Sequence, residues 1–470
     1  MRKVKGDKGM LMEKNEIKVG ICTLGCRVNQ YESRAISEYL EAHGATVAPF
    51  DTVCDVYVIN TCAVTAESER KSRQMARRAH KLNPQAAIVM TGCASQLHPE
   101  AAAKLPNVRY VGGNASKLDA ARAALNAVGA ESSEPIMGNM EIGKEYESYS
   151  VMTPDHTRAY VKIEDGCDNK CAYCVIPKVR GPVRSKAPCE VIEEVRHLAG
   201  IGYKEIVLTG IETCSYQYGL TDIIKKIHGI EGIERIRLSS VNPSFINKRF
   251  TDEKKDLPKF CPHFHLSLQS FCDRTLNAMR RRYNVRMIFE NCAYVRENLK
   301  NVCFTADMIC GFPGETDADH AETLANTERL GLLFAHIFPY SDRPGTEASE
   351  MKDKVDEAVK NARCAALRAV VNESRECIIS KYINEGTPLH ALFETEKNGY
   401  LFGHTENFIE VKAKADIFAS SLLSESVAPL SDSGEKCTIF TRSLLGRVFS
   451  VKLTKMEING SDIVVNADKM

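Results

Sequence analysis

Apolar and polar residues follow two kinds of pattern along the first quarter of the chain. Short apolar runs predict strands and amphipathic stretches predict helices, with strands at 18–24, 56–60, 87–91 and 107–111 and helices at 30–43 and 66–82. Strands that alternate with helices in this way are typical of a parallel sheet covered by helices. The pattern therefore predicts an N-terminal α/β domain over 15–128.

A second α/β series begins after the stretch 129–153, which is polar, rich in Glu and Ser and aperiodic, and is therefore predicted to be a linker. Six more strands are predicted, each followed by enough chain for a helix, at 158–164, 205–209, 235–239, 263–268, 302–309 and 333–337. This repeat is typical of a βα barrel, either partial or complete and TIM-like. A charged helix over about 353–384 completes the predicted second domain, 154–384.

The sequence pattern changes again near residue 386, where short segments of alternating polarity are separated by Gly and Asn turns. These strands are predicted at 388–394, 401–404, 409–413, 436–440 and 448–455. Such a series indicates a small β-barrel over 385–470. We expect this barrel to be self-contained.

Composition narrows the class of protein. The 470 residues are 44% hydrophobic and 26% charged, which is typical of a soluble globular protein. No apolar run approaches the roughly 18 residues of a membrane span, and the lysine-rich start lacks the apolar core of a secretory signal. A cytoplasmic protein with no membrane partner is predicted. The net charge of +1 means that any nucleic acid would have to bind a local basic patch.

The chain has 18 cysteines, and three of them lie on one short loop. Cys167, Cys171 and Cys174 form a C-x3-C-x2-C motif directly after the first strand of the predicted barrel. Three thiolates at this spacing can bind three irons of a 4Fe–4S cubane and leave the fourth open. S-adenosylmethionine can chelate such an open iron, and an electron from the cluster can then cleave it to a radical. A structural zinc site is the alternative, although it would need a fourth ligand.

Three other cysteines follow the strands of the first domain. Cys26, Cys62 and Cys93 each lie at a strand-to-helix turn, beside Gly or Thr. Because such turns meet at one edge of a parallel sheet, these thiols can converge although they are distant in sequence. Each alone would be interpreted as a packing cysteine, but together they predict a second three-cysteine cluster.

The cysteine loop and the segments after it resemble the radical S-adenosylmethionine superfamily. Gly210-Ile211-Glu212 occupies the position of a Gly-Gly-Glu turn in that superfamily, which implies that Glu212 contacts the amino group of S-adenosylmethionine. A solvated loop acid is the alternative interpretation of this residue. Ser239 and Ser240 match a region that often lines the cofactor site.

Nearly the whole chain resembles the methylthiotransferase family within that superfamily. The resemblance rests on 23–33 and 60–65 in the first domain, and on 265–270, 279–283, 311–316 and 338–341 in the second. It implies a three-cysteine N-terminal domain, a central radical domain and a C-terminal TRAM module that binds RNA. The chain departs from the family pattern at Phe271, where a glycine usually stands.

The residues around Cys26 and Cys62 are most similar to one branch of the family. That branch acts on N6-threonylcarbamoyladenosine at position 37 of tRNA, next to the anticodon. The branches that act on N6-isopentenyladenosine and on a ribosomal-protein aspartate have other residues after the first cysteine. These two substrates remain alternatives, as does an RNA-binding protein whose clusters are only structural.

The resemblance also implies the chemistry and the partners. Two 4Fe–4S clusters are expected, with S-adenosylmethionine as both methyl donor and radical source, to place a methylthio group on carbon 2 of the adenine. The expected partners are the tRNA anticodon stem-loop and an electron donor such as flavodoxin or ferredoxin, and the sulfur donor is unidentified. The candidate RNA contacts are Lys71, Arg73, Arg77 and Arg78, Arg280 to Arg282, Arg180 with Arg184, and Asn407 with Phe408.

Overall fold

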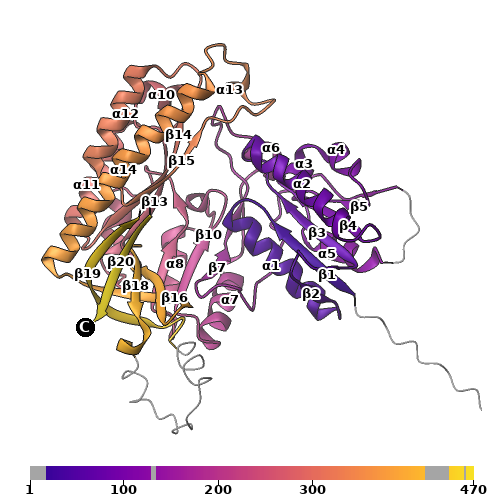
Figure 1. Cartoon of the computed structure of the whole chain (residues 1–470), viewed down its shortest axis with the longest axis horizontal. Helices are drawn as coiled ribbons and strands as arrows, with labels where there is room; N and C mark the ends of the chain where they lie inside the picture. The colour runs from indigo at the N-terminus through magenta and orange to yellow at the C-terminus, as the bar shows by residue number, and fades with distance from the viewer. Residues whose placement is uncertain (1–16, 129–133, 419–443, 460–461) are drawn as a thin grey trace, which may run out of the picture.

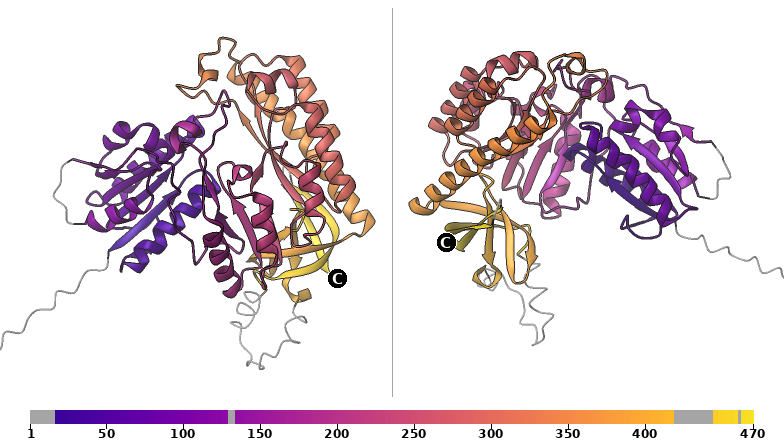
Figure 2. Two further views of the ribbon diagram at one scale, coloured as in Figure 1. Left: turned by 180° about the vertical axis from the view of Figure 1, so that it is seen from behind. Right: turned by 45° about the horizontal axis from the view of Figure 1, so that its top comes forward.

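The computed structural model describes residues 17–128, 134–418, 444–459 and 462–470. These residues form an N-terminal α/β domain, a central partial barrel and a C-terminal β-barrel. The first and the last lie against different sides of the central domain (Figures 1 and 2). None of the described helices is both long enough and apolar enough to cross a membrane.

The N-terminal domain is a six-stranded parallel sheet in the order β2-β1-β3-β4-β5-β6. Its strands are β1 (Lys18–Thr23), β2 (Thr46–Ala48), β3 (Val56–Thr61), β4 (Ala87–Gly92), β5 (Val108–Val111) and β6 (Ile136–Met137). Its helices are α1 (Arg27–Ala42), α2 (Ala66–Leu82), α3 (Cys93–Leu97), α4 (Pro99–Ala103) and α5 (Leu118–Asn126). Separate apolar clusters fill the two faces of the sheet, and every residue of β3 and β4 is buried. The predicted fold class of this domain is confirmed.

The central domain is a parallel partial barrel made of two adjoining sheets, β7-β10-β11 and β12-β13-β14-β15. Its strands are β7 (Ala159–Lys162), β10 (Glu205–Thr209), β11 (Arg235–Leu238), β12 (Ser240–Val241), β13 (His263–Gln269), β14 (Cys303–Cys310) and β15 (Phe334–Pro339). The intervening helices are α7 (Pro188–Gly200), α8 (Leu220–His228), α9 (Lys248–Lys254), α10 (Asp273–Ala278), α11 (Val285–Asn298), α12 (Asp317–Leu330), α13 (Glu347–Glu350) and α14 (Glu357–Glu385). The predicted partial barrel is confirmed.

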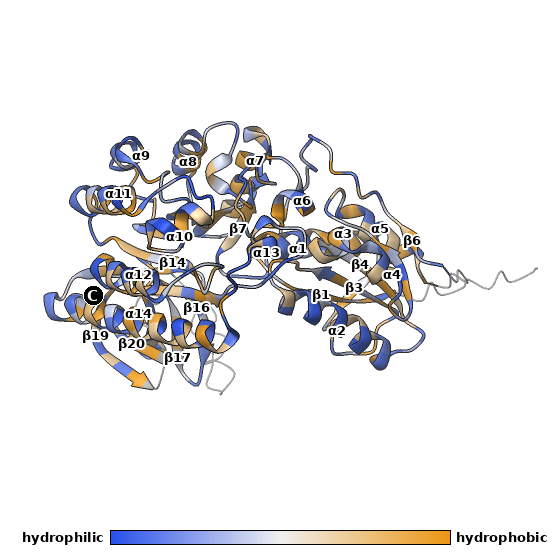
Figure 3. Ribbon diagram, turned by 90° about the horizontal axis from the view of Figure 1, so that it is seen from above, coloured by the Kyte–Doolittle hydropathy of each residue, from blue (hydrophilic) through white to orange (hydrophobic). Residues whose placement is uncertain are grey.

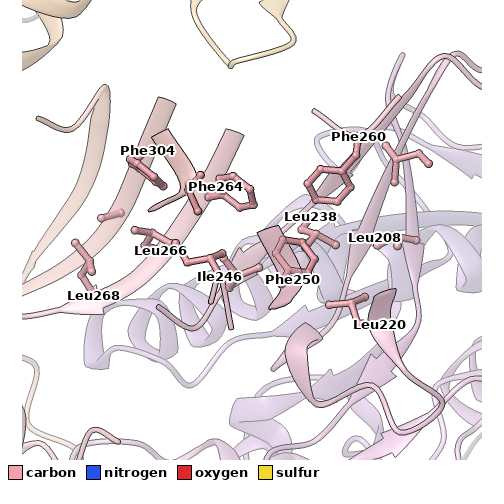
Figure 4. Close-up of a cluster of buried hydrophobic side chains, with 14 of the residues drawn as sticks. Leu208, Leu220, Leu238, Ile246, Phe250, Phe260, Phe264, Leu266, Leu268 and Phe304 are labelled. Atoms are coloured by element: carbon pink, nitrogen blue, oxygen red, sulfur yellow. The ribbon is translucent and has the colours of Figure 1, made fainter. Parts of the chain in front are cut away.

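The core of the central domain lies between the strands and the helices outside them. Leu208, Leu238, Leu266 and Phe304 point from successive strands into this layer (Figure 4). The strands are therefore largely hydrophobic, whereas the outward faces of the helices are hydrophilic (Figure 3). Phe271 belongs to the same core, where it is fully buried and its ring stacks on Phe289 with centroids 5.1 Å apart.

The C-terminal strands close into a barrel in the order β16-β17-β18-β20-β19. These strands are β16 (Pro388–Lys397), β17 (Tyr400–Thr405), β18 (Glu410–Lys414), β19 (Val448–Asn459) and β20 (Asp462–Lys469). The predicted strand 436–440 lies outside the described residues, and β20 was not predicted.

The polar segment 134–153 connects the first two domains and packs against both of them. It contributes β6 to the first sheet. Tyr31 of α1 donates a hydrogen bond to the Tyr149 carbonyl at 3.2 Å, and Lys186 Nζ of the central domain donates to the same oxygen at 2.8 Å. The chain between the domains is therefore fixed to each of them.

The turn between β17 and β18 inserts into the central domain where its strands begin. Arg235 Nη2 donates to the Thr405 carbonyl at 2.8 Å, and Arg237 Nη1 donates to the Glu406 carbonyl at 3.0 Å. Both arginines are buried and form ion pairs with Glu205 at 2.7 Å. The expectation of a self-contained barrel is therefore wrong, because removal of the barrel would expose these buried charges.

Phe408 and Asn407 lie in the same turn, and the prediction that they bind RNA bases is wrong. Asn407 is fully buried. The Phe408 ring stacks on His263 with centroids 4.4 Å apart and lies 5.0 Å from the Arg237 guanidinium. Sequence periodicity placed Phe408 at a turn but could not show that the turn is covered.

Replacing Glu205 tests the charged joint between barrel and central domain. Although burial acts in the opposite direction, Arg235 and Arg237 lower the pKa of Glu205 to about 2. Since this carboxylate is easier to ionise in the folded protein, its stabilising effect is complete above its ordinary pKa of 4.5 and is lost as the pH falls towards 2. Glu205→Gln should lower the free energy of unfolding at pH 7 by about 3 kcal/mol.

Urea unfolding measured between pH 7 and pH 3.5 checks this prediction. The difference in the free energy of unfolding between Glu205→Gln and the unmutated protein should become smaller as the pH falls below 4.5. Glu234→Gln, at an exposed glutamate that pairs with Lys204, is the matched control and should change stability by less than about 0.5 kcal/mol. If Glu205→Gln lowered the free energy of unfolding equally at all pH values, the proposed role of the carboxylate charge would be contradicted.

Candidate active site

Cys167, Cys171 and Cys174 lie on a loop between β8 (Glu164–Asp165) and α6 (Ile176–Arg180). Backbone hydrogen bonds fix this loop at both ends. The Cys167 N–H donates to the Gly181 carbonyl at 3.1 Å, and the Ala172 N–H donates to the Met279 carbonyl at 3.1 Å. These two bonds tie the loop to Gly181 on one side and to Met279 on the other.

The three cysteines of this loop lie within electrostatic range of one another, and burial affects the ionisation of Cys167 and Cys174. Burial raises the pKa of the Cys167 thiol to about 11 and that of Cys174 to about 12, and Cys171 raises both further. Such thiols stay protonated at neutral pH unless a metal displaces the protons. The Ile176 N–H donates to Cys174 Sγ at 3.4 Å, and backbone donors of this kind stabilise cluster-bound sulfur. The residues therefore fit an iron–sulfur cluster with three protein ligands.

Arg281 lies directly against this cysteine loop, a contact that sequence reasoning missed. Its Nη1 atom donates to Cys171 Sγ at 3.1 Å and is 3.5 Å from the Tyr173 hydroxyl. Its other nitrogens bond the Tyr283 hydroxyl and the Ser267 carbonyl, so the guanidinium is held in place. The signal was present in the motif 279–283, but a run of arginines is normally interpreted as a solvated face.

The structure brings Glu212 to the cysteine loop. Asn169 Nδ2 of that loop donates to Glu212 Oε2 at 3.2 Å, and burial raises the pKa of Glu212 above its usual value. Glu164, which was not predicted, accepts the Glu212 backbone N–H at 2.8 Å. A Cβ atom on Gly210 would lie 2.5 Å from the same Glu164 oxygen, so this turn requires glycine.

Ser239 and Ser240 lie where β11 ends and β12 begins. The Ser239 hydroxyl is 2.9 Å from the Thr213 hydroxyl, next to the Glu212 turn. Ser240 is half-buried on the neighbouring strand. Both serines thus border the same end of the barrel as Glu212.

Cys26, Cys62 and Cys93 converge at the carboxyl edge of the first sheet. A Cβ atom on Gly25 would lie 2.8 Å from Cys62 Sγ, so the chain before Cys26 passes directly over Cys62. Burial raises the pKa of the Cys62 thiol to about 11, and Cys93 and Cys26 raise it further. Cys62 and Cys93 are buried, whereas Cys26 is exposed. Cys62 therefore lies beside the chain that precedes Cys26 and within electrostatic range of Cys26 and Cys93.

Buried charges surround this second group of thiols and join the two domains. The ion pairs connect two carboxylates to four cations, namely Glu32 and Asp165 to Lys117, Lys162, Arg180 and Arg184. We call these six residues the interdomain charge cluster. Its shortest pair joins Arg180 Nη1 to Glu32 Oε1 at 2.7 Å, and both side chains are fully buried.

The interdomain charge cluster has more cations than anions and lies against Cys93. Burial alone would lower the pKa of Arg180, but Asp165 and Cys93 hold this pKa well above its usual range. Burial lowers the pKa of Lys117, which Cys93 and Glu32 oppose. An excess of buried cations is costly unless an anion lies beside it. Three thiolates on an iron–sulfur cluster would supply that anion, so the donor set and its surroundings fit the predicted second cluster.

Helix α6 connects the two groups of thiols. It begins two residues after Cys174 and ends at Arg180 of the interdomain charge cluster. Val179 of this helix and Val175 just before it are buried and pack against Cys93 and its neighbours in the first domain. Asn114 Nδ2 donates to the Val179 carbonyl at 2.8 Å and lies 3.5 Å from Cys93 Sγ. The two candidate metal sites are thus linked by one short helix.

Two of the arginines predicted to contact RNA are buried in the structure. Arg180 and Arg184 are buried in the interdomain charge cluster, so the prediction that they bind RNA is wrong. Arg281 is bonded internally as described above, while Arg280 and Arg282 are exposed. On α2, Lys71, Arg77 and Arg78 are exposed, and Arg73 is half-buried and pairs with Glu69.

The inner face of the barrel carries a further polar group that sequence reasoning missed. His265, Asp307 and His336 each present one ligand-type atom within 4.8 Å of the others, without an ion. His265 Nε2 is 3.2 Å from Asp307 Oδ2, and its Nδ1 is 2.7 Å from the Thr305 hydroxyl. The His265 ring is therefore fixed by protein groups on both sides.

Comparison with known proteins identifies the family. Residues 161–326 match the model of the radical SAM superfamily, and residues 18–113 match that of the uncharacterized protein family UPF0004. The threonylcarbamoyladenosine tRNA methylthiotransferase of Bacillus subtilis is 37% identical over 414 residues, which cover 84% of this chain and 90% of that protein. The chain belongs to the tRNA methylthiotransferase family. It is therefore a radical SAM enzyme, with S-adenosylmethionine and iron–sulfur clusters as cofactors.

Other members of the tRNA methylthiotransferase family are similarly close. The threonylcarbamoyladenosine tRNA methylthiotransferase of Aquifex aeolicus is 37% identical and is aligned over 96% of its length and 84% of this chain. A tRNA-2-methylthio-N(6)-dimethylallyladenosine synthase of Thermodesulfovibrio yellowstonii is 31% identical over 96% of its length and 87% of this chain.

A solved structure supports the fold alone. The radical S-adenosylmethionine methyltransferase TsrM of Kitasatospora setae, with cobalamin and a [4Fe-4S] cluster bound, superposes with a TM-score of 0.53 at 14% identity. The match covers 71% of this chain and 77% of that one.

Replacing Arg281 tests its role beside Cys171. A hydrogen bond to a cluster sulfur favours the reduced, more negative cluster, so Arg281→Gln should make the reduction potential of this cluster more negative. A loss of about 1.4 kcal/mol corresponds to a shift of roughly 60 mV for one electron. The potential is measured by electron paramagnetic resonance in a Cys62→Ala background, so that one cluster titrates.

Arg280→Gln is the control for this experiment, because Arg280 is exposed and pairs with Glu347 instead of a cysteine. Its potential should match that of the background variant. Equal shifts in both arginine variants would show that general charge, and not the contact with Cys171, sets the potential.

Proposed function

We propose that this enzyme attaches a methylthio group to carbon 2 of N6-threonylcarbamoyladenosine at position 37 of tRNA. The observation that carries the proposal is the identity of 37% to relatives with this activity in their names, over nine-tenths or more of their length. The two converged groups of three cysteines support it, because methylthiolation needs a radical source and a separate place for the sulfur.

The two sets of three cysteines are proposed to have different roles in the reaction. Cys167, Cys171 and Cys174 would hold one cluster, which would bind S-adenosylmethionine and supply the electron for its cleavage, and Cys26, Cys62 and Cys93 would hold the second cluster. Bound cofactor supplies a 5′-deoxyadenosyl radical and a methyl group, which the protein alone cannot provide. Carbon 2 of adenine carries an unactivated C–H bond, which explains why a radical and not a base is required.

The described residues orient the reactants around these clusters. We propose that Glu212 accepts a hydrogen bond from the amino group of S-adenosylmethionine, with Asn169 and Glu164 fixing its position. Ser239 and Ser240 lie at the same end of the barrel. Arg281 compensates the negative charge at Cys171.

The remaining partners are proposals as well. We propose that the barrel 385–470 acts as a TRAM module that contacts the tRNA anticodon stem-loop. The N-terminal α/β domain, 15–128, and the central radical domain, 154–384, are the other two proposed functional units. The exposed Lys71, Arg77, Arg280 and Arg282 are candidates for phosphate contacts. A small electron carrier such as flavodoxin or ferredoxin would reduce the clusters.

Single cysteine replacements test the proposed division of labour. Cys171→Ala should abolish formation of 5′-deoxyadenosine, because the open iron is lost with its cluster. Cys62→Ala should still cleave S-adenosylmethionine but attach no methylthio group. Anaerobic reconstitution should give about eight irons per chain without mutation and about four in either variant, since each cubane holds four.

Cys377→Ala is the matched control, because Cys377 is exposed on α14 and distant in sequence from both motifs. It should retain all irons and full activity. Loss of cofactor cleavage in both Cys62→Ala and Cys171→Ala, each well folded, would refute the division.

The substrate is tested by mass spectrometry of nucleosides after reaction with tRNA. The enzyme should convert tRNA that carries N6-threonylcarbamoyladenosine and leave tRNA that carries N6-dimethylallyladenosine unchanged. The reverse preference would assign it the substrate of the Thermodesulfovibrio yellowstonii relative.

A further inference from the structure

Strand β15 presents an exposed aromatic wall to the inside of the partial barrel. Ala335 and Ile337 point outward into the core shared with the helices, so the alternate residues Phe334, His336 and Phe338 point inward. Phe334 is 40% exposed and Phe338 is 46% exposed. The His336 ring lies between them, with centroids 4.8 Å from Phe334 and 6.3 Å from Phe338. Exposed apolar residues that line up in this way mark a binding surface.

Helix α1 occupies part of the opposite wall. Tyr31 and Ala35 of α1 pack with Tyr160 and Val207 on the inner face of β7 and β10. The first residue of α1 is Arg27, which directly follows Cys26. Its guanidinium lies 4.9 Å from the Tyr160 ring centre. The inside of the barrel is therefore bounded by α1 on one side and by the aromatic wall on the other.

Arg27 is a cation that lacks a compensating carboxylate. It is exposed, and among the described residues it forms no ion pair, its hydrogen bond being to the neutral Gln30 at 3.0 Å. Its charge also acts on His336, so the guanidinium lies within electrostatic range of the aromatic wall. Asp307, which lies opposite His336 on the neighbouring strand β14, is 3.2 Å from His265. An anionic ligand would thus find a free guanidinium beside an aromatic surface.

We infer that Arg27 binds the carboxylate of the threonylcarbamoyl group, while the aromatic wall of Phe334, His336 and Phe338 packs against the rest of this substituent. The inference rests on the proposed function and names the residue that selects the substrate. A threonyl group carries a carboxylate, whereas a dimethylallyl group is apolar and would leave the guanidinium desolvated and unpaired. The position of Arg27 directly after Cys26 places this selection beside the second cluster.

Binding of anticodon stem-loops to the reconstituted enzyme without reductant tests this inference. One RNA carries N6-threonylcarbamoyladenosine, and a second carries the same group with its carboxylate converted to a neutral amide. Arg27→Gln should weaken binding of the first RNA by about 10- to 100-fold, the range expected when a charge-assisted hydrogen bond is lost. It should leave binding of the amide RNA unchanged, and Arg27→Lys should retain part of the affinity.

Two controls separate this contact from damage to the enzyme. Arg249→Gln removes an exposed cation on α9, which pairs with Glu253, and should bind both RNAs as the unmutated enzyme does. Iron content should be unchanged in Arg27→Gln, which shows that both clusters remain. Phe338→Ala should weaken both RNAs equally, because it removes packing and not charge.

Equal weakening of both RNAs by Arg27→Gln would overturn the inference and assign Arg27 to a phosphate of the tRNA. Failure of the proposed function would be visible differently. The unmutated enzyme would then bind or convert dimethylallyladenosine RNA at least as well as threonylcarbamoyladenosine RNA, whatever residue 27 does.

Discussion

The contact between Glu32 and Arg180 holds together the parts of this enzyme that must act on one substrate. Glu32 belongs to the first domain and Arg180 to the second, and neither side chain is exposed to solvent. Breaking one partner of such a pair leaves a buried charge and costs several kcal/mol. The arrangement of the two groups of thiols therefore depends on an ionic contact instead of on apolar packing alone.

The excess of cations in the interdomain charge cluster gives this contact a second role. Lys117 and Arg180 lie within electrostatic range of Cys93. Within the interdomain charge cluster itself, four cations face only two carboxylates. A bound cluster would supply the missing negative charge, so binding of iron and docking of the two domains stabilise each other.

Much of the fold and both cysteine groups could be predicted from the sequence, since hydrophobic period and the order of elements are local properties. The positions of Cys26, Cys62 and Cys93 follow from the rule that parallel strands end at one edge. Burial between domains could not be predicted in this way. Arg180 and Phe408 have the local surroundings of exposed residues, and only the tertiary contacts with Glu32 and His263 bury Arg180 and cover the Phe408 ring. Arg27 stands in the segment after Cys26 that indicated the branch of the family, but the sequence could not show that it shares the inside of the barrel with strand β15, more than 300 positions later.

Helix α6 imposes a constraint on how the family's chains can vary in length. Five residues separate a metal-binding loop from the arginine that docks the other domain. Side chains can change on the outer side of such a helix, but an inserted residue would rotate Arg180 by about 100° and displace it by about 1.5 Å. Glu32 would then face a different residue, and Val179 would leave Cys93. This interval is expected to tolerate substitution during evolution but not insertion or deletion, in contrast to the surface loops around it.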